Sequence, residues 1–147
     1  MKKKRVVIIS LLLLLVSVIG ISSYFLFKDK INLLDVDHSA VDWNGKKQKD
    51  TSGEENTIAI PGFEKVTLYA NETKQAVNFH NPEINDCYFK ISLIHPDGSV
   101  LWISDLIEPG KGMYSIELEK TLAVGEYENA VLKYECFSLN DQSPLNG

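Results

Sequence analysis

Basic residues are scarce over most of this 147-residue chain. Residues 31–147 contain nine Lys or Arg against nineteen Asp or Glu, whereas residues 1–30 contain six Lys or Arg and a single acid. Nucleic-acid binding needs clustered Lys and Arg to neutralise phosphates, and the acidic part of the chain has no such cluster. The sequence therefore argues against a nucleic-acid partner.

Catalytic and cofactor motifs are also missing. The sequence has no Gly-x-Ser-x-Gly elbow, no Ser-x-x-Lys, no His-Glu-x-x-His and no phosphate-binding loop. Its three histidines, His38, His80 and His95, fall in an expected linker and in two expected turns, and neither cysteine has metal-ligand spacing with a histidine. We therefore expect no catalytic residues, no cofactor and no metal.

One long uncharged segment stands out near the N-terminus. Val6–Phe27 is a run of 22 residues without a charge, about 33 Å long as a helix, which is enough to cross the ~30 Å hydrocarbon core. Four basic residues precede it and Lys28-Asp29-Lys30 follows. The sequence therefore predicts a single-pass protein of the plasma membrane. The excess of positive charge before the segment places residues 1–5 in the cytoplasm and the residues after the segment outside the cell.

A cleaved signal peptide is the alternative for this segment. Gly20 and Ser22 form a small-x-small site, but apolar residues continue beyond it to Phe27. Cleaved peptides usually have an apolar core of only ~7–15 residues. The length of the run therefore favours an uncleaved signal-anchor.

The rest of the chain divides into a polar linker over 28–56 and a domain over 57–147. The linker lacks hydrophobic periodicity, apart from a few apolar residues that include Trp43. The domain consists of short apolar or alternating runs separated by turn residues, with no amphipathic helix between them, which predicts an antiparallel β-sandwich. The expected strands are Thr57–Ile60, Lys65–Ala70, Gln75–Phe79, Cys87–Ile94, Val100–Asp105, Met113–Leu118 and Glu126–Leu139.

A short motif favours one kind of sandwich. The stretch from Leu122 to Tyr127 has the pattern Leu-x-x-Gly-x-Tyr, which resembles a strand entry of bacterial immunoglobulin-like domains. There, Gly125 would make the turn and Tyr127 would close a corner by a hydrogen bond to the backbone. Tyr134-Glu135-Cys136 offers a second resemblance to the Tyr-x-Cys of antibody-type domains, but Tyr127 is favoured as the corner because a turn precedes it.

The order of these parts resembles a known group of proteins. A basic N-terminus, a single anchor and a polar linker precede Ile58-Ala59-Ile60-Pro61-Gly62-Phe63, Cys87-Tyr88-Phe89-Lys90-Ile91-Ser92-Leu93 and Asn129-Ala130-Val131-Leu132-Lys133-Tyr134-Glu135-Cys136. The chain is similar to small, membrane-anchored, uncharacterised surface proteins of Gram-positive Firmicutes. The resemblance implies location and an immunoglobulin-like fold, and it implies no activity.

Two cysteines and two aromatic residues are candidate site residues. Cys87 and Cys136 lie on expected strands, and the expected location outside the cell is oxidising, so they either form a disulfide or remain as two buried thiols. Trp102 and Tyr114 either form a ligand platform for a saccharide or fill the core.

These observations lead to three functional hypotheses. The first is a membrane-tethered, extracellular, non-enzymatic module that binds another protein, for example in surface or secretion assembly. The second is a carbohydrate- or wall-binding module that uses Trp102 and Tyr114. The third and least favoured is a small hydrolase.

The end of the chain suggests an incomplete sheet. After Leu139 the residues read as a turn, and a seven-stranded sandwich commonly takes about 100 residues, whereas residues 57–147 number 91. The sequence predicts that the last strand is missing, either because the sequence is a piece of a longer product or because a partner donates the strand.

Overall fold

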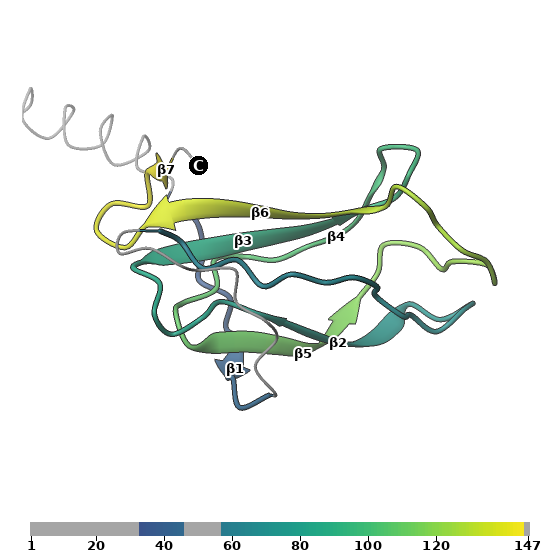
Figure 1. Cartoon of the computed structure of the whole chain (residues 1–147), viewed down its shortest axis with the longest axis horizontal. Helices are drawn as coiled ribbons and strands as arrows, with labels where there is room; N and C mark the ends of the chain where they lie inside the picture. The colour runs from purple at the N-terminus through teal and green to yellow at the C-terminus, as the bar shows by residue number, and fades with distance from the viewer. Residues whose placement is uncertain (1–32, 46–56, 146–147) are drawn as a thin grey trace, which may run out of the picture. The chain divides into compact units, whose positions relative to one another are not determined.

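The computed structural model describes residues 33–45 and 57–145, and this part of the chain is all-β. Its strands form two sheets that lie one above the other in Figure 1, with the orders β1-β5-β2 and β4-β3-β6-β7. All strand pairs within the sheets are antiparallel. The strands are β1 (Val41–Asp42), β2 (Lys74–His80), β3 (Cys87–Ile94), β4 (Val100–Ile103), β5 (Lys111–Glu117), β6 (Val131–Ser138) and β7 (Pro144–Leu145).

The expected membrane segment, Val6–Phe27, lies outside the described residues. Among residues 33–45 and 57–145, the structure contains no helix that is long and apolar enough to cross a membrane.

Strand β3 forms because its side chains alternate between apolar and more polar from Cys87 to Leu93. Its odd-numbered residues from Cys87 to Leu93 are buried in the core, and its even-numbered residues face outward, apart from the buried Ser92. The whole strand pairs with β6, with Phe89 opposite Cys136 and Leu93 opposite Leu132. Burial of one complete face fixes this register, because a slip by one residue would turn the apolar face to solvent.

The core lies between the two sheets. It is formed by large side chains from both sheets and from the loops that join them, namely Phe79, Phe89, Ile91, Leu93, Leu101, Trp102, Ile107, Met113, Ile116, Leu118 and Leu122, together with Cys87. Phe79 of β2 contacts Trp102 of β4 across the core, with ring centroids 5.9 Å apart. Each fully buried large side chain of this kind stabilises the fold by about 1.5–3 kcal/mol.

Two expected strands, Thr57–Ile60 and Lys65–Ala70, are not strands. Side-chain amides take the place of a neighbouring strand: the Asn85 amide bonds the N–H and C=O of Ala59, at 2.8 and 2.9 Å. The Gln75 amide does the same for Tyr69, at 2.7 and 2.9 Å. Residues 57–70 therefore run in extended form beside the sheets, as the blue-green trace between the two layers of Figure 1 shows.

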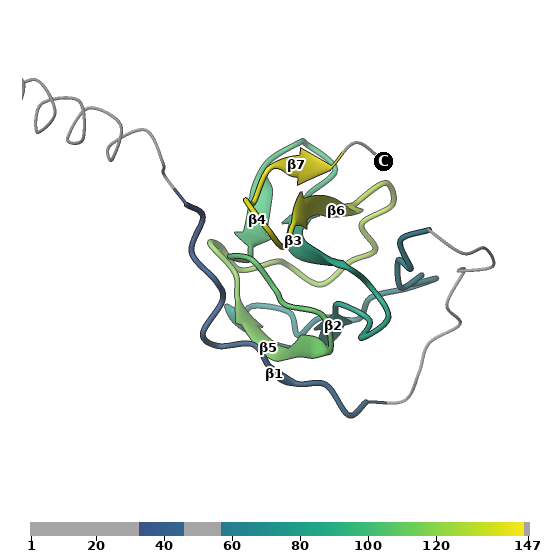
Figure 2. The ribbon, with the colours of Figure 1, turned by 90° about the vertical axis from the view of Figure 1, so that its left-hand side faces the viewer.

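Part of the expected linker belongs to the folded unit. Among the described residues, those from Leu34 onward belong to one compact unit, and the linker residues Val41 and Asp42 pair with Gly112 and Lys111 of β5. Figure 2 shows residues 33–45 running along the side of the two sheets. The expected linker over 28–56 therefore contains a short strand, which the sequence pattern does not indicate because it does not show the edge of β5 against which this strand pairs.

The C-terminal region also differs from the expectation. The expected strand Glu126–Leu139 begins only at Val131, and β7 follows where only a turn is expected. Leu145 and Pro144 of β7 pair with Cys136 and Phe137. In the described part of the chain, β6 therefore has neighbours on both sides at its end, while residues 131–135 have a strand partner only on the β3 side.

Candidate functional site

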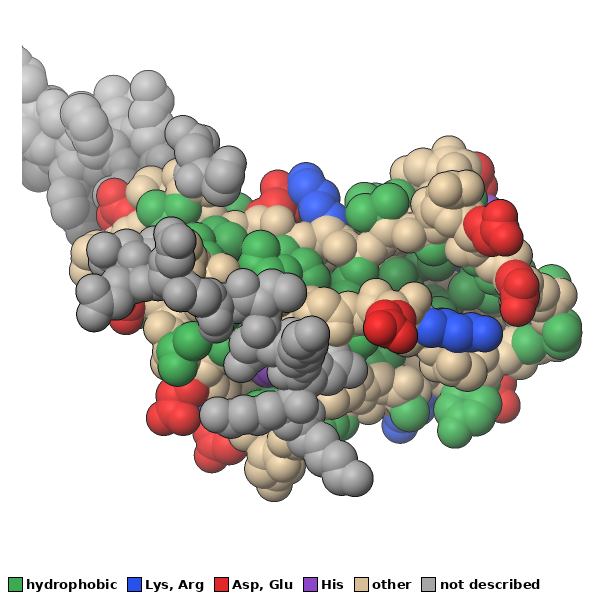
Figure 3. All heavy atoms as spheres, viewed as in Figure 1, with side chains coloured by type: hydrophobic (Ala, Val, Ile, Leu, Met, Phe, Trp, Pro, Cys, Tyr) green, Lys and Arg blue, Asp and Glu red, His purple; other side chains and the backbone are tan. Residues whose placement is uncertain are grey.

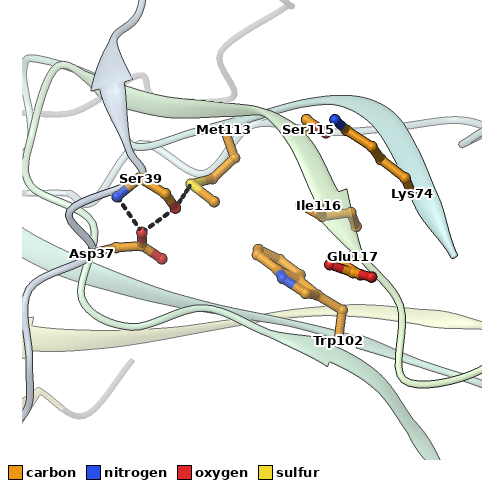
Figure 4. A pocket seen from close by; sticks show the side chains of 8 residues that line it. All are labelled: Asp37, Ser39, Lys74, Trp102, Met113, Ser115, Ile116 and Glu117. Carbon is orange, nitrogen blue, oxygen red and sulfur yellow. Dashed lines mark hydrogen bonds between the residues drawn. The ribbon is translucent and has the colours of Figure 1, made fainter.

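The structure has a pocket of about 320 Å³ on the side of the molecule where β4 and β5 face each other. Three apolar side chains line it: Trp102 of β4 and Met113 and Ile116 of β5. Figure 4 shows the indole of Trp102 extending from β4 toward β5. The remaining lining is polar or charged and consists of Asp37, Ser39, Lys74, Ser115 and Glu117.

The N-terminal segment forms one end of this pocket. The carboxylate of Asp37 accepts hydrogen bonds from Ser39 N at 3.0 Å and from the Ser39 hydroxyl. That hydroxyl lies 3.7 Å from the sulfur of Met113. The same carboxylate accepts a bond from Asp105 N at 3.3 Å. These contacts hold Asp37 and Ser39 at the left-hand end of the site in Figure 4.

Trp102 and Tyr114 do not form a shared platform. Trp102 is only 8% exposed and packs in the core. Tyr114 lies on the other sheet, where its hydroxyl donates to Asn44 Oδ1 at 3.0 Å and accepts from Asn44 N at 2.9 Å. Tyr114 thus fastens the N-terminal segment to β5, and of the two alternatives for Trp102, a ligand platform or a core residue, the structure shows a core position.

Cys87 and Cys136 lie on neighbouring strands and face the same side of the sheet. Cys87 is opposite Ser138 and Cys136 is opposite Phe89, so the two cysteines are diagonal neighbours with free thiols. Burial, followed by the charge of Cys136 and a hydrogen bond donated to its sulfur, raises the pKa of Cys87 to about 12. Burial also raises the pKa of Cys136. The structure brings together the two residues that the sequence singled out, without a bond between them.

Tyr127 makes a short-range hydrogen bond to the backbone. Its hydroxyl donates to the carbonyl of Ala123, four residues upstream, at 3.0 Å. This is the type of contact that a tyrosine corner makes. Gly125 lies between these two residues, and an added Cβ there would meet no atom within 4 Å.

Tyr134, the alternative corner residue, points into the core beside Phe89. Its hydroxyl is buried without a hydrogen-bond partner in the described part of the chain. Burial raises the pKa of this phenol well above its usual range.

Trp43 is the residue that the sequence analysis underestimated. Its indole Nε1 donates to Asn78 Oδ1 at 2.8 Å, and its ring stacks on the imidazole of His80. His80 is the buried last residue of β2, not part of a turn as expected. In the sequence, the only indication of this contact is that a tryptophan, Trp43, occurs in an otherwise polar segment.

The outward face of the sheet β4-β3-β6 carries an apolar row. Val100 of β4 and Val131 of β6 both lie opposite Ile94 of β3, and the two valines are 46% and 49% exposed. Ile103, which lies opposite Ser92, is 49% exposed. We call Ile94, Val100, Ile103 and Val131 the aliphatic face. Lys133, also opposite Ser92, borders it and forms an ion pair with Glu135 at 3.0 Å.

The charged groups are dispersed over the surface. Figure 3 shows isolated Lys side chains, without a basic cluster, on the visible face of the described residues. Among the described residues, no three His, Cys, Asp or Glu side chains lie close enough together to hold a metal ion.

Hydrogen bonds from the hydroxyl and N–H of Ser99, and a further one from His95, hold the pKa of Asp97 well below its usual range.

We compared the chain with protein-family models, with curated proteins and with solved structures, and none of the three comparisons finds a match.

Proposed function

We propose that this protein is a non-enzymatic protein-binding module with an immunoglobulin-like β-sandwich, held outside the plasma membrane by its N-terminal anchor. The anchor and its orientation rest on the uncharged run Val6–Phe27 and on the basic residues before it. A surface protein of a Gram-positive cell, as the sequence resemblance implies, would have this arrangement.

Two features support the immunoglobulin-like interpretation. The sheet β4-β3-β6-β7 faces the sheet β1-β5-β2, and the chain changes sheet between β2 and β3, between β4 and β5 and between β5 and β6. Repeated crossing between two antiparallel sheets is typical of immunoglobulin-like sandwiches. The hydrogen bond from Tyr127 to Ala123 lies just before β6, where a tyrosine corner would lie.

The aliphatic face carries the protein-binding proposal. Isolated exposed apolar residues are ordinary, but β-branched side chains on three adjacent strands form a contiguous apolar surface. Such surfaces mark sites where proteins bind, since their removal from water stabilises a complex. The neighbouring Lys133 and Glu135 would form part of a polar rim around this contact.

Photo-crosslinking in the native cell tests this proposal. A photoreactive amino acid placed at Ile103 should give one discrete protein adduct, identified by mass spectrometry. The matched control is the same amino acid at Val124, which is 86% exposed and belongs to the loop before β6, not to the aliphatic face. The adduct at position 103 should disappear when Val131 is also changed to Lys. No adduct, or the same adducts at both positions, would argue against a docking role.

The location has its own test. A protease added to intact cells should degrade residues 57–147. Full protection in cells shown to be intact would contradict the proposed topology, whatever the crosslinking shows.

Carbohydrate binding is the weaker candidate. Sugar rings stack on exposed aromatic faces, and Trp102 presents too little of its ring for this contact. Tyr114 belongs to the opposite sheet and already bonds Asn44.

A further inference from the structure

The edge of β5 that faces away from β2 is covered only in part. Strand β1 pairs with it at Lys111 and Gly112, and from Met113 to Glu117 no strand in the described part of the chain pairs with this edge. The N-terminal segment leaves β5 here, because Asp37 N bonds Leu106 O at 2.8 Å and Leu106 N bonds Asp35 O at 2.9 Å. The pocket lies along the uncovered stretch of β5.

The backbone of this stretch presents hydrogen-bonding groups to the pocket side. Just beyond the paired ends of β2 and β5, Leu118 N donates to Thr73 O at 2.8 Å, so Leu118 and Thr73 are a hydrogen-bonded pair. Bonded and non-bonded pairs alternate in antiparallel strands. Ser115 and Glu117, opposite Ala76 and Lys74, occupy the non-bonded positions. Their N–H and C=O groups therefore point away from β2, as at the edge of a sheet that accepts another strand.

Both ends of the uncovered stretch are closed. At one end Glu119 N bonds Leu101 O at 2.8 Å and ties the chain after β5 to β4. At the other end Asp37 and Ser39 contact Asp105 and Met113. The opening therefore accommodates a short extended segment, about five residues long, rather than the edge of a whole sheet.

The side chains around the opening define the chemistry of the segment. Side chains alternate along an extended strand, so one of them would point between the sheets toward Trp102, Met113 and Ile116, which favours an apolar residue. The rim has two carboxylates, Asp37 and Glu117, against the single ammonium of Lys74. This balance favours Lys or Arg in the segment that binds.

We propose that the opening between β4 and β5 binds an extended segment of another protein, which adds as a strand to β5 at Met113–Glu117. The segment carries an apolar residue that enters the pocket and Lys or Arg beside it. Backbone hydrogen bonds to Ser115 and Glu117 supply affinity, and the pocket supplies selectivity, as in other cases of strand addition. This site shares no residue with the aliphatic face and does not depend on it.

Selection from a phage-displayed library of random ten-residue peptides tests the proposal on the full-length chain in detergent. The enriched peptides should contain an apolar residue flanked by Lys or Arg and no central Pro. Ser115→Pro removes the N–H that points to the pocket and leaves the bonds to β2 intact, so it should weaken the best peptide at least about tenfold. Ser115→Ala keeps the N–H and should bind within about twofold of the wild type.

A second pair of variants keeps the proposal testable if Ser115→Pro does not fold. Glu117→Lys should weaken the same peptides severalfold, whereas Glu128→Lys, at an exposed residue of the loop before β6 that does not line the pocket, should not. The proposal is overturned if no peptide is enriched, if the enriched peptides lack Lys and Arg, or if a folded Ser115→Pro binds them as the wild type does. A dimer that Ser115→Pro dissociates would also overturn it, because the occupant would then be a second copy.

The outcomes are separable from those of the crosslinking experiment. Ser115→Pro leaves Ile103 and Val131 unchanged, so an adduct at position 103 should persist in this variant. If Ser115→Pro loses peptide binding but keeps the adduct at position 103, the opening between β4 and β5 is impaired and the aliphatic face is not.

Discussion

The indole ring of Trp43 lies flat on the imidazole of His80, with ring centroids 3.8 Å apart and planes 10° from parallel. The contact joins the N-terminal segment to the end of β2. Together with the bond from Trp43 N to Gly110 O at 2.9 Å and the Lys111–Asp42 ion pair, it holds residues 33–45 on the sheet β1-β5-β2. Because the Asp42 side chain is 92% exposed to solvent, which screens its attraction to Lys111, we expect the stacked rings to stabilise this attachment more than the ion pair does.

Removal of the indole should therefore detach this segment. Trp43→Ala loses the stacking and the hydrogen bond to Asn78, and we expect the free energy of unfolding to fall by about 2 kcal/mol. Trp43→Phe keeps an aromatic ring without the N–H and should lose about 1 kcal/mol. Urea unfolding monitors both, and limited proteolysis should cut residues 33–45 faster in Trp43→Ala. Equal proteolysis of this variant and the wild type would show that other contacts hold the segment.

Two glycines provide a matched pair of substitutions. A Cβ at Gly112 would come within 2.8 Å of Trp43 Cδ1 and 2.9 Å of the Phe79 carbonyl oxygen, so Gly112→Ala forces the backbone or the tryptophan to move. We expect a loss of about 1–3 kcal/mol. At Gly125 no atom lies within 4 Å and the backbone φ is not positive, so Gly125→Ala should be nearly neutral. Thermal unfolding distinguishes the two, and similar melting temperatures would contradict the close approach at Gly112.

The cysteine pair predicts a sensitivity to oxidation. Cys87 and Cys136 are diagonal neighbours, and we expect them to form a disulfide in the protein isolated from an oxidising medium. The bridge would close a loop of 49 residues and stabilise the fold by about 4 kcal/mol in the chain-entropy model. Mass spectrometry of non-reduced peptides should find the linked pair. Cys136→Ser should abolish both the link and the difference in the free energy of unfolding between the oxidised and the reduced protein. Free thiols after complete oxidation would contradict the prediction.

The reduced protein should show a slow thiol. Because the pKa of Cys87 is raised to about 12, almost no thiolate is present at pH 8. Alkylation by iodoacetamide at pH 8 should be slower at Cys87 than at an exposed cysteine by on the order of a thousandfold. Unfolding in urea should abolish the difference. A folded, reduced protein that reacts at the rate of a free cysteine would show that the thiol is not buried.

Asp97 should contribute to the loss of stability in acid. Its pKa is lower in the folded chain than the usual unfolded value near 4, because Ser99 and His95 bond the carboxylate. The folded state therefore binds fewer protons, and the stabilisation is present above about pH 4 and is lost as pH falls through the folded pKa. Asp97→Asn should flatten the decline of the urea midpoint between pH 5 and pH 2, with Glu119→Gln as the charge-matched control. An equally steep decline in Asp97→Asn would contradict this role.

Strict alternation explains why parts of the fold could be predicted from the sequence. The expected strand Cys87–Ile94 and its inward residues are confirmed residue by residue, because only one register buries all the apolar side chains. Lys65–Ala70 alternates just as clearly, and Val66 and Leu68 do pack against the core. It forms no strand because the amide of Gln75 bonds Tyr69 where a strand would, and a periodicity argument does not include side-chain amides.

The candidate site was less predictable because it depends on contacts between distant residues. The sequence left Trp102 as either a platform residue or a core residue, and its position opposite Leu93 turns its ring into the core. The pocket beside it exists because β1 begins only at Val41, opposite Gly112, and leaves β5 uncovered from Met113 onward. The length over which two strands pair depends on the path of both strands in three dimensions. The local sequence pattern of one strand carries no information about that path.

The position of β1 has a consequence for the order of folding. Asn44 and its partner Tyr114 are 70 residues apart in the sequence, so the N-terminal segment leaves the ribosome long before β5 exists. A contact this distant in the chain requires the closure of a long loop, which slows folding. Residues 33–45 are made before β5, and we expect them to dock late, so that the uncovered edge of β5 in the newly folded chain extends beyond the pocket to Lys111.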